Sequence, residues 1–375
     1  MGKIYSSLGL MSGTSMDGID VSVIKSDGEN KFEAVFDKFF EYDSAIYQQL
    51  TKIRDKINSS KNLKTYSQAL DSLEREITLF HAIVVKRVLK EHDSKIDLIG
   101  FHGQTIFHNA NEKISKQLGD GNLLSSLLRN KVVYNFRQND LENGGQGAPL
   151  APIFHQLLVK QNNIKLPVCI LNIGGIANIS IINSHKDSEL KSYDVGPGNC
   201  LIDDMVRKKT DKKYDLNGQL AKDGVTSKII LDQALDNFDN IKNKKNLSFD
   251  IKDFDLSFVR GLSLQNALST LTEFTAQMIA RSLLNLMLIE KTKTWNVLVA
   301  GGGRKNSFLM ELVKKEMPNN IKINLIDDYT INGDFVESQA FGYLAIRSYL
   351  KLPISFPLTT NVKKPCTGGI LAENY

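Results

Sequence analysis

Three glycine-rich turns, each after an apolar run that predicts a strand, are the most chemically suggestive feature of this chain. They are Gly13 to Gly18 in SGTSMDG, the pair Gly174 and Gly175, and the triplet Gly301, Gly302 and Gly303. Glycine allows the backbone to approach a ligand closely, and backbone N–H groups in such turns bind phosphate. One turn of this kind would be routine, whereas three at strand ends favour a nucleotide phosphate site. A P-loop and a first GxGxxG unit are both missing from the sequence.

The first turn also carries side-chain oxygens. Thr14 and Ser15 offer hydroxyls, and Asp17 and Asp20 offer carboxylates. Magnesium prefers oxygen ligands and keeps several waters, so these carboxylates could orient Mg²⁺ through water. The alternative is that Asp17 and Gly18 form a plain hairpin turn between two strands.

Asp194 is the candidate general base. It lies in DVGPGN, after a predicted strand and beside a loop that contains proline and two glycines. A carboxylate acts as a base only if it reaches a water or hydroxyl at hydrogen-bond distance. The alternative is an Asx-turn, or a cap for the helix predicted to begin near Cys200.

A second polar run, His102, Gln104 and Thr105, follows a short strand predicted at Ile96 to Gly100. Ligands of α/β proteins bind beyond the carboxyl ends of strands, so this run is expected to bind a sugar by hydrogen bonds or to form a turn. A metal site would need further ligands at close spacing, and His108 alone does not supply them.

Arg137 and Asp140 lie between another predicted strand and the glycine-rich segment at Gly144 to Gly147. An arginine there can bind a substrate carboxylate with two parallel hydrogen bonds. The same pair could instead fix the glycine-rich loop. Both interpretations remain open from the sequence.

The predicted elements alternate between strands and helices. An apolar stripe predicts a helix over roughly residues 65 to 91, and a second one predicts a helix from Leu264 to Met287. Further elements are predicted as strands at Tyr5 to Met11, Ile19 to Lys25, Val132 to Phe136, Pro167 to Ile173, Ala177 to Ile182 and Asn296 to Ala300, and as helices at Leu123 to Arg129, from about Asn306, and at Glu337 to Tyr349. The glycine-containing hairpin occurs in both halves, which favours an internally duplicated fold.

Composition limits the possible classes of protein. A chain of 375 residues with 42% apolar and 24% charged residues is expected to form two globular domains with a cleft between them. The net charge of +5 is too mild to indicate nucleic acid, and the basic run at Arg207 to Lys213 has no interleaved aromatic residues. Three cysteines without a CxxC pair suit a reducing compartment. Without a leader-like start or a long apolar run, we expect a cytoplasmic protein with no membrane partner.

Six of these segments together resemble the anhydro-N-acetylmuramic acid kinase family. They are MSGTSMDGIDVSV at Met11 to Val23, GFHGQTIFH at Gly100 to His108, GGQGAPLAPIFH at Gly144 to His155, LNIGGIANIS at Leu171 to Ser180, DVGPGNCLIDD at Asp194 to Asp204 and VAGGGRKNSFLM at Val299 to Met310. The resemblance therefore spans almost the whole chain.

The resemblance implies a two-domain actin-like, hexokinase-type ATPase fold of the α/β class, with duplicated mixed-sheet lobes around an interdomain cleft. We expect lobes at residues 1–140 plus 338–375 and at 141–337. It also implies ATP-dependent conversion of 1,6-anhydro-N-acetylmuramic acid to N-acetylmuramic acid 6-phosphate in peptidoglycan recycling, with Mg²⁺ present. Another actin-like sugar kinase and a non-catalytic, ATP-switched binding protein are the alternatives.

The resemblance also assigns expected roles to residues. Asp194 resembles the base that activates water at the anomeric carbon, and Glu337 resembles a carboxylate that contacts the sugar. The expected ATP-binding set is Gly13, Thr14, Ser15, Met16, Asp17, Gly18, Ile19, Asp20, Gly174, Gly175, Gly301, Gly302 and Gly303. The expected substrate-binding set is His102, Gln104, Thr105, Arg137, Asp140, Asn199 and Glu337, and Mg²⁺ is expected at Asp17 through water.

Two positions depart from the pattern expected of the family. Gly121 follows Asp120 where proline is expected, and Ser338 follows Glu337 where alanine is usual. Gly121 leaves the role of Asp120 in sugar binding open. The expected partner is a small amino sugar, and a homodimer is one arrangement that the sequence leaves open.

Overall fold

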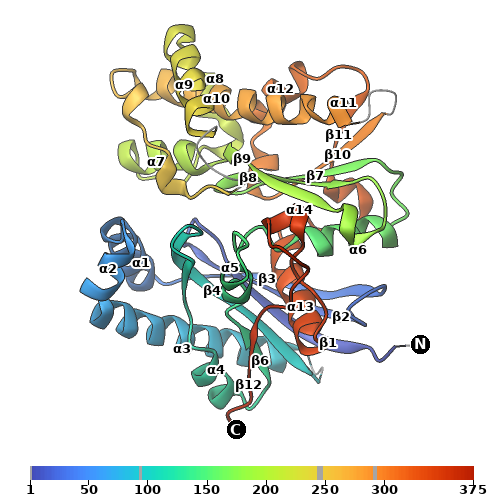
Figure 1. Ribbon diagram of the computed structural model, residues 1–375. Coiled ribbons are helices and arrows are strands. Elements are labelled where there is room, and N and C mark those ends of the chain that lie inside the picture. Colours follow the sequence, from blue (N-terminus) through green and yellow to red (C-terminus); the bar gives the residue numbers. More distant parts are fainter. Residues whose placement is uncertain (1, 93–94, 243–247, 290–293) are drawn as a thin grey trace. The chain divides into compact units, whose positions relative to one another are not determined.

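The computed structural model describes residues 2–92, 95–242, 248–289 and 294–375, which form two compact units (Figure 1). Unit 1 comprises Met1–Ile164, His185–Leu190 and Phe335–Tyr375, and unit 2 comprises Lys165–Ser184 and Lys191–Asp334. The lobe boundary expected after residue 140 would assign residues 141–164 to the other unit. The structure places this segment, with its helix, in unit 1.

Unit 1 contains a mixed sheet. Its strands are β1 (Tyr5–Ser12), β2 (Gly18–Ser26), β3 (Phe32–Glu41), β4 (Leu98–Asn109), β5 (Ile114–Leu118), β6 (Val132–Tyr134) and β12 (Ile370–Ala372). Its helices are α1 (Ser44–Lys56), α2 (Ser60–Thr65), α3 (Ser67–Glu91), α4 (Gly121–Leu128), α5 (Gln138–Glu142), α6 (Pro152–Gln161), α13 (Val336–Tyr349) and α14 (Pro357–Thr360). The strand order is β12-β6-β4-β1-β2-β3, and β5 pairs with β4.

Alternation along β1 explains how helices cover both faces of this sheet. Leu8 and Leu10 point into the apolar core that also contains residues of α3. Gly9 points the other way, where a Cβ atom would lie 1.9 Å from the carbonyl oxygen of Ser338 in α13. Glycine at this position therefore lets α13 lie directly against the strand.

Unit 2 contains a second mixed sheet. Its strands are β7 (Val168–Ile173), β8 (Ile176–Ile182), β9 (Lys191–Pro197), β10 (Trp295–Ala300) and β11 (Ile321–Leu325). Its helices are α7 (Cys200–Lys209), α8 (Gln219–Lys222), α9 (Lys228–Lys242), α10 (Leu264–Leu284), α11 (Leu286–Ile289) and α12 (Ser307–Lys315). The long helix α10 packs its apolar stripe on β7, β9 and β10, as the core residues of these elements show.

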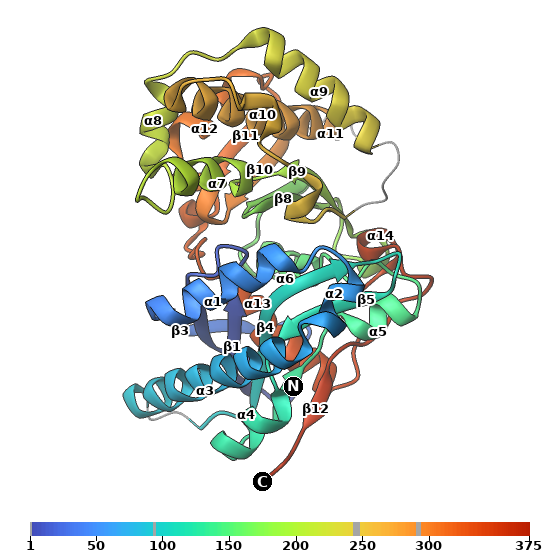
Figure 2. The ribbon, with the colours of Figure 1, turned by 90° about the vertical axis from the view of Figure 1, so that its left-hand side faces the viewer.

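The two sheets share one topology. In unit 1 the order β3-β2-β1-β4-β6 joins two antiparallel pairs to two parallel pairs, and β9-β8-β7-β10-β11 does the same in unit 2. A long helix, α3 or α10, precedes the first parallel crossover strand in each unit (Figure 2). The predicted two-domain α/β fold with duplicated mixed sheets is therefore confirmed.

One predicted strand was wrong in a way that affects the site. The strand expected at Ile96 to Gly100 runs over Leu98–Asn109, so His102, Gln104 and Thr105 lie inside β4 and not beyond its end. The strand continues because β5 pairs with its second half, and Gly103 takes a φ of +73° where the ladder becomes irregular. The sequence between the two strands gave no clear hairpin signal.

Candidate active site

The first glycine turn is a five-residue loop at one end of the unit 1 sheet. It joins β1, which ends at Ser12, to β2, which begins at Gly18. The Met16 N–H donates to the Gly13 carbonyl at 3.2 Å, Met16 takes a φ of +59°, and the Ser15 hydroxyl donates to the Asp17 carboxylate. The loop is therefore longer than the two-residue Asp-Gly turn that was the alternative reading. Ile19 and Asp20 lie in β2.

Uncharged side chains of unit 1 support this loop through hydrogen bonds. The Gln104 amide donates to the Gly13 carbonyl at 2.9 Å, and the Ser12 and Tyr42 hydroxyls lie 2.9 Å apart. His81 is fully buried, with Nδ1 2.8 Å from the Ile77 carbonyl and Nε2 3.5 Å from the Ser12 hydroxyl. Burial lowers the pKa of His81 to about 4, so this imidazole is neutral at physiological pH.

The glycines of the three turns differ in what surrounds them. A Cβ atom on Gly13 or Gly174 would meet nothing closer than 3.6 Å, and one on Gly302 would meet nothing within 4 Å. None of the three has a φ in the left-handed region. Neither internal packing nor backbone conformation therefore requires glycine at these positions. Close approach of a bound molecule to the backbone would explain glycine at these positions.

Three elements of unit 1 bring His102, Arg137 and Glu337 together. His102 lies in β4, Arg137 precedes α5, and Glu337 lies in the first turn of α13. Arg137 Nη2 lies 2.9 Å from His102 Nε2, and Phe341, one turn after Glu337, contacts the His102 ring with a centroid separation of 4.4 Å. The positive charge of Arg137 also acts on Glu337.

The charges in this cluster are fixed by burial. Burial, followed by the charge of Arg137, lowers the pKa of His102 well below its usual value. Its neutral Nε2 therefore accepts from Arg137, while Nδ1 donates to the Gly103 carbonyl at 2.7 Å. Burial raises the pKa of Glu337 even though Arg137 opposes the shift. The cluster combines a guanidinium, a neutral imidazole and a carboxyl group.

Asp140 binds its own loop. Its carboxylate accepts from the Gly147 N–H at 2.6 Å and from the Thr360 hydroxyl at 2.6 Å. Arg137 Nη1 donates to the carbonyl of the same Gly147 at 2.8 Å. Of the two readings left open by the sequence, these contacts support the loop-fixing one for Asp140, whereas Arg137 belongs to both the loop and the His102 cluster.

The other predicted glycine turns meet at one end of the unit 2 sheet. Gly198 and Asn199, which follow β9, donate backbone hydrogen bonds of 2.9 and 2.8 Å to the carbonyls of Gly175 and Gly174. Gly303 packs so tightly on Ile173 that a Cβ atom would lie 2.2 Å from its side chain. The turns after β7, β9 and β10 therefore form one continuous group.

Asp194 lies within β9, six residues before α7 begins, so it does not cap that helix as the alternative required. The residue is buried, with 8% of its surface exposed, and its Oδ2 accepts the Phe249 N–H at 2.8 Å. This hydrogen bond fixes the orientation of the carboxylate. Asp194 is therefore a held carboxylate near the turn that contains Asn199.

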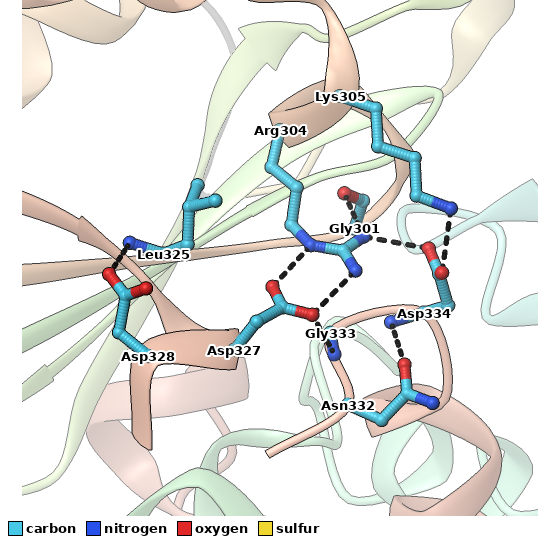
Figure 3. A network of polar contacts seen from close by, with 9 residues as sticks. All are labelled: Gly301, Arg304, Lys305, Leu325, Asp327, Asp328, Asn332, Gly333 and Asp334. Atoms are coloured by element: carbon cyan, nitrogen blue, oxygen red, sulfur yellow. Dashed lines mark hydrogen bonds and ion pairs between the residues drawn. The ribbon is translucent and has the colours of Figure 1, made fainter. Parts of the chain in front are cut away.

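Arg304, directly after the glycine triplet, is the centre of a polar network in unit 2 (Figure 3). Its guanidinium donates to both oxygens of Asp327, at 2.7 and 2.9 Å, to Asp334 at 2.7 Å and to the Gly301 carbonyl at 3.1 Å. Burial opposes its charge, but these ion pairs raise the pKa of Arg304 above its usual range. The network holds the first residue of the triplet.

Oxygen ligands for a metal ion are sparse in the described residues. No group of three or more His, Cys, Asp or Glu side chains there could hold a metal ion. Asp17 offers one carboxylate in the first turn. A single carboxylate suits Mg²⁺ that also binds phosphate oxygens and water, because this ion seldom uses an all-protein site.

Comparison with known proteins identifies the relatives of this arrangement. The sequence profile of the anhydro-N-acetylmuramic acid kinase family matches residues 5–373. An anhydro-N-acetylmuramic acid kinase of Pelagibacter ubique is 62% identical over 375 residues, which is 100% of both chains, and that of Zymomonas mobilis is 36% identical over 96% of this chain and 98% of its own. This chain belongs to the anhydro-N-acetylmuramic acid kinase family. It is therefore a kinase that acts on a carbohydrate.

Solved structures of lower similarity cover most of the chain. The component A of (R)-2-hydroxyglutaryl-CoA dehydratase from Acidaminococcus fermentans is 11% identical, with a TM-score of 0.42 over 92% of this chain and 100% of its own. The activator of 2-hydroxyisocaproyl-CoA dehydratase from Clostridium difficile, solved with ADPNP, is 12% identical, with a TM-score of 0.40 over 91% and 94%. The fold class stated above rests on the two sheets themselves. No helix in the described part of the chain is long and apolar enough to cross a membrane.

The two departures expected from the anhydro-N-acetylmuramic acid kinase pattern have local explanations. Asp120 caps α4 by accepting the N–H groups of Asn122 and Leu123, and a Cβ atom on Gly121 would lie 2.2 Å from the Tyr134 ring. Ser338 lies 2.7 Å from the Ser22 hydroxyl, inside the sheet-facing side of α13. Gly121 therefore makes room for Tyr134, and Ser338 adds a buried hydrogen bond.

Sequence reasoning missed Tyr42, His81 and Arg304 as neighbours of the predicted turns. Arg304 does stand inside the family segment VAGGGRKNSFLM, so its position beside the triplet was visible. Its partners Asp327 and Asp334 lie far along the chain in segments without a motif. Thr105, which the sequence did single out, accepts from Gln117 of β5 at 3.3 Å.

Proposed function

We propose that this chain uses ATP to convert 1,6-anhydro-N-acetylmuramic acid to N-acetylmuramic acid 6-phosphate. In this reaction water adds to C1 as the C1–O6 bond breaks, and O6 takes the γ-phosphoryl group while the bond to ADP breaks. The proton of the water passes to a base. One water and one ATP are consumed for each sugar phosphate and ADP formed.

The open glycines carry this proposal. Gly13 follows β1 in unit 1, and Gly174 and Gly302 follow β7 and β10 in unit 2; at each of the three, the space that a side chain would fill is open. Phosphoryl transfer depends on positioning and charge neutralisation more than on covalent catalysis, so backbone N–H groups suit it. In this role the turns bind the triphosphate, and Asp17 contributes to Mg²⁺ binding through water.

Asp194 serves as the base in this proposal. Its carboxylate is held by the Phe249 N–H, which orients it without neutralising it. On the sugar side, Arg137 offers a guanidinium for the lactyl carboxylate, and Glu337 and neutral His102 offer hydrogen bonds to hydroxyl or amide groups. We expect the reaction in the cytoplasm, where ATP is available.

A product assay tests the proposal. Full-length protein with ATP, Mg²⁺ and the anhydro sugar should give a 6-phosphorylated reducing sugar, detected by mass spectrometry, in step with ADP. Phosphorylation only of sugars without the 1,6-bridge, such as N-acetylglucosamine, would favour another sugar kinase. ADP release without any sugar phosphate would favour an ATP-driven binding protein.

A further inference from the structure

The Arg304 network forms a closed ring around the start of the glycine triplet. Arg304 donates to the Gly301 carbonyl, and the Gly301 N–H donates to the Gly333 carbonyl at 3.2 Å. The Gly333 N–H donates to Asp327 Oδ1 at 3.3 Å, and the same oxygen accepts Arg304 Nη2 (Figure 3). Both backbone groups of Gly301 are therefore held by one circuit.

Glycine at position 301 needs such support. Gly301 has a φ of +78°, and a Cβ atom there would lie 2.5 Å from Asn172 Oδ1. A glycine has many accessible backbone conformations, so the observed one persists only where its surroundings fix it. Gly302 follows immediately and has no neighbour of its own within 4 Å of a Cβ position. Gly301 is the N-cap of the short 3-10 helix Gly302–Lys305, so its conformation sets the direction in which the chain enters Gly302.

The charges of the network balance. Two carboxylates, Asp327 and Asp334, face two cations, Arg304 and Lys305, whose ammonium lies 2.6 Å from Asp334 Oδ2. Only 5% of the Arg304 side chain is exposed, compared with 61% of Lys305. Arg304 therefore holds the buried end of the network, and Lys305 holds the exposed end.

We propose that Arg304 is a positioning residue that sets the Gly301–Gly303 turn for the phosphates of ATP, with Asp327 and Asp334 acting through it. The inference rests on the proposed function, because it assumes that this turn binds ATP. Lysine cannot replace Arg304, because only the planar guanidinium reaches Asp327 through two hydrogen bonds while also reaching Asp334 and Gly301.

Nucleotide binding to the full-length protein tests this assignment. In Arg304→Gln, the Kd for a non-hydrolysable ATP analogue with Mg²⁺, measured by calorimetry, should rise about tenfold or more, and kcat/KM for ATP should fall by about a hundredfold, the loss that a misplacement of about 1 Å can cause. The KM for the anhydro sugar should change little. Arg304→Lys should show most of the same loss, because lysine keeps the positive charge but cannot make the several hydrogen bonds of the guanidinium at once.

A surface arginine of the same unit provides the matched control. Arg281→Gln removes the exposed ion pair with Asp239, at 3.2 Å, and should leave nucleotide binding unchanged. A folded Arg304→Gln protein with wild-type nucleotide affinity would overturn the proposal, as would equal losses for nucleotide and sugar. Circular dichroism checks folding, and if Arg304→Gln does not fold, Arg304→Lys decides by the same criteria.

The outcome separates this inference from the function it builds on. If the wild-type protein neither binds the ATP analogue nor forms the sugar phosphate, the proposed function fails. If the wild-type protein does both and the Arg304 variants bind nucleotide normally, only the positioning role fails.

Discussion

The glycine turn after β1 in unit 1 and the glycine turn after β10 in unit 2 follow strands of the same kind of sheet, yet they are held by different chemistry. After β1, the turn at Gly13 is supported by the amide of Gln104 and by the Ser12 hydroxyl, which lies beside Tyr42 and His81. After β10, the turn at Gly301 is supported by Arg304 and two carboxylates. The side chains around each turn thus decide how firmly, and under which conditions, that turn is held.

The distribution of histidines also differs between the two units. All six of them lie in unit 1, at positions 81, 92, 102, 108, 155 and 185. Burial lowers the pKa of His81, His108 and His155 to about 4 and that of His102 well below its usual value. Unit 1 therefore depends on neutral imidazoles, and the Arg304 network of unit 2 depends on ionised carboxylates.

The largest effect should come from Asp194 of unit 2. Asp194→Asn keeps the hydrogen bond from Phe249 but removes the charge, so turnover should fall by about a thousandfold or more while nucleotide affinity is retained. Steady-state kinetics and calorimetry measure the two quantities. Asp232→Asn, at an exposed position of α9, serves as the control. Near-normal turnover in Asp194→Asn would remove it from the role of base.

The open glycines should affect binding in both units without affecting stability. Gly13→Ala and Gly302→Ala add a methyl group that meets no protein atom closer than 3.9 Å, so the free energy of unfolding should stay within about 1 kcal/mol of wild type. The KM for ATP should rise about tenfold or more, because the methyl group occupies the space that we propose for a phosphate group. Gly261→Ala is the matched control, since its Cβ also meets nothing within 4 Å but it follows no strand. Unchanged KM values in both turn variants would contradict the shared role of the turns.

The two units should lose stability at different pH values. A buried histidine with a pKa near 4 stays neutral in the folded state, while in the unfolded state it takes up a proton below about pH 6.5. Its contribution to stability is therefore complete above pH 6.5 and is lost as the pH falls toward 4, by about 2 kcal/mol per histidine between pH 7 and 5. Hydrogen exchange, corrected for intrinsic rates, should show unit 1 losing protection at pH 5 before unit 2.

The carboxylates of unit 2 respond in a lower range. The hydrogen bonds from Arg304 lower the pKa of Asp327, and for Asp334 the bonds from Arg304 and Lys305 outweigh the opposite effect of burial. Their contribution is present above the ordinary carboxyl pKa near 4 and is lost only as the pH falls through the lowered values. His81→Phe should reduce the pH 5 effect in unit 1. Equal loss of protection in the two units at pH 5 would contradict the comparison.

The smallest effect should come from Tyr42 in unit 1. Tyr42→Phe removes the hydroxyl beside Ser12 and should lower the free energy of unfolding by about 1 kcal/mol, the usual net worth of one hydrogen bond. Urea denaturation measures this change, and Tyr375→Phe at the exposed C-terminus is the control. If Tyr42→Phe lost as much ATP affinity as Arg304→Gln, the uncharged contacts around the Gly13 turn would matter as much for ATP binding as the ion pairs around the Gly301 turn.

The sequence predicted those features that follow from local patterns. The glycine turns, the strands at β1, β2, β7, β8 and β10, and the helices α3, α10 and α13 were visible because periodicity and turn residues specify them locally. The duplicated topology was also predicted from the repeated hairpin. The side-chain networks could not be predicted from the sequence. The partners of Arg304 and Ser12 come close to them only in the folded chain, and they lie in segments without a recognisable motif. The full length of β4 was not predicted, because its second half is a strand only through its pairing with β5, which local sequence patterns did not indicate.

The excursion of His185–Leu190 into unit 1 has a consequence for dissecting the molecule. The chain passes between the units at 164/165, 184/185, 190/191 and 334/335, which makes four covalent connections. A protease that cuts at one, two or three of these points leaves the two units on a common covalent framework. The complete units of this kinase can therefore separate only after all four are cleaved, and a gene for unit 2 alone would need a new loop to join Ser184 to Lys191.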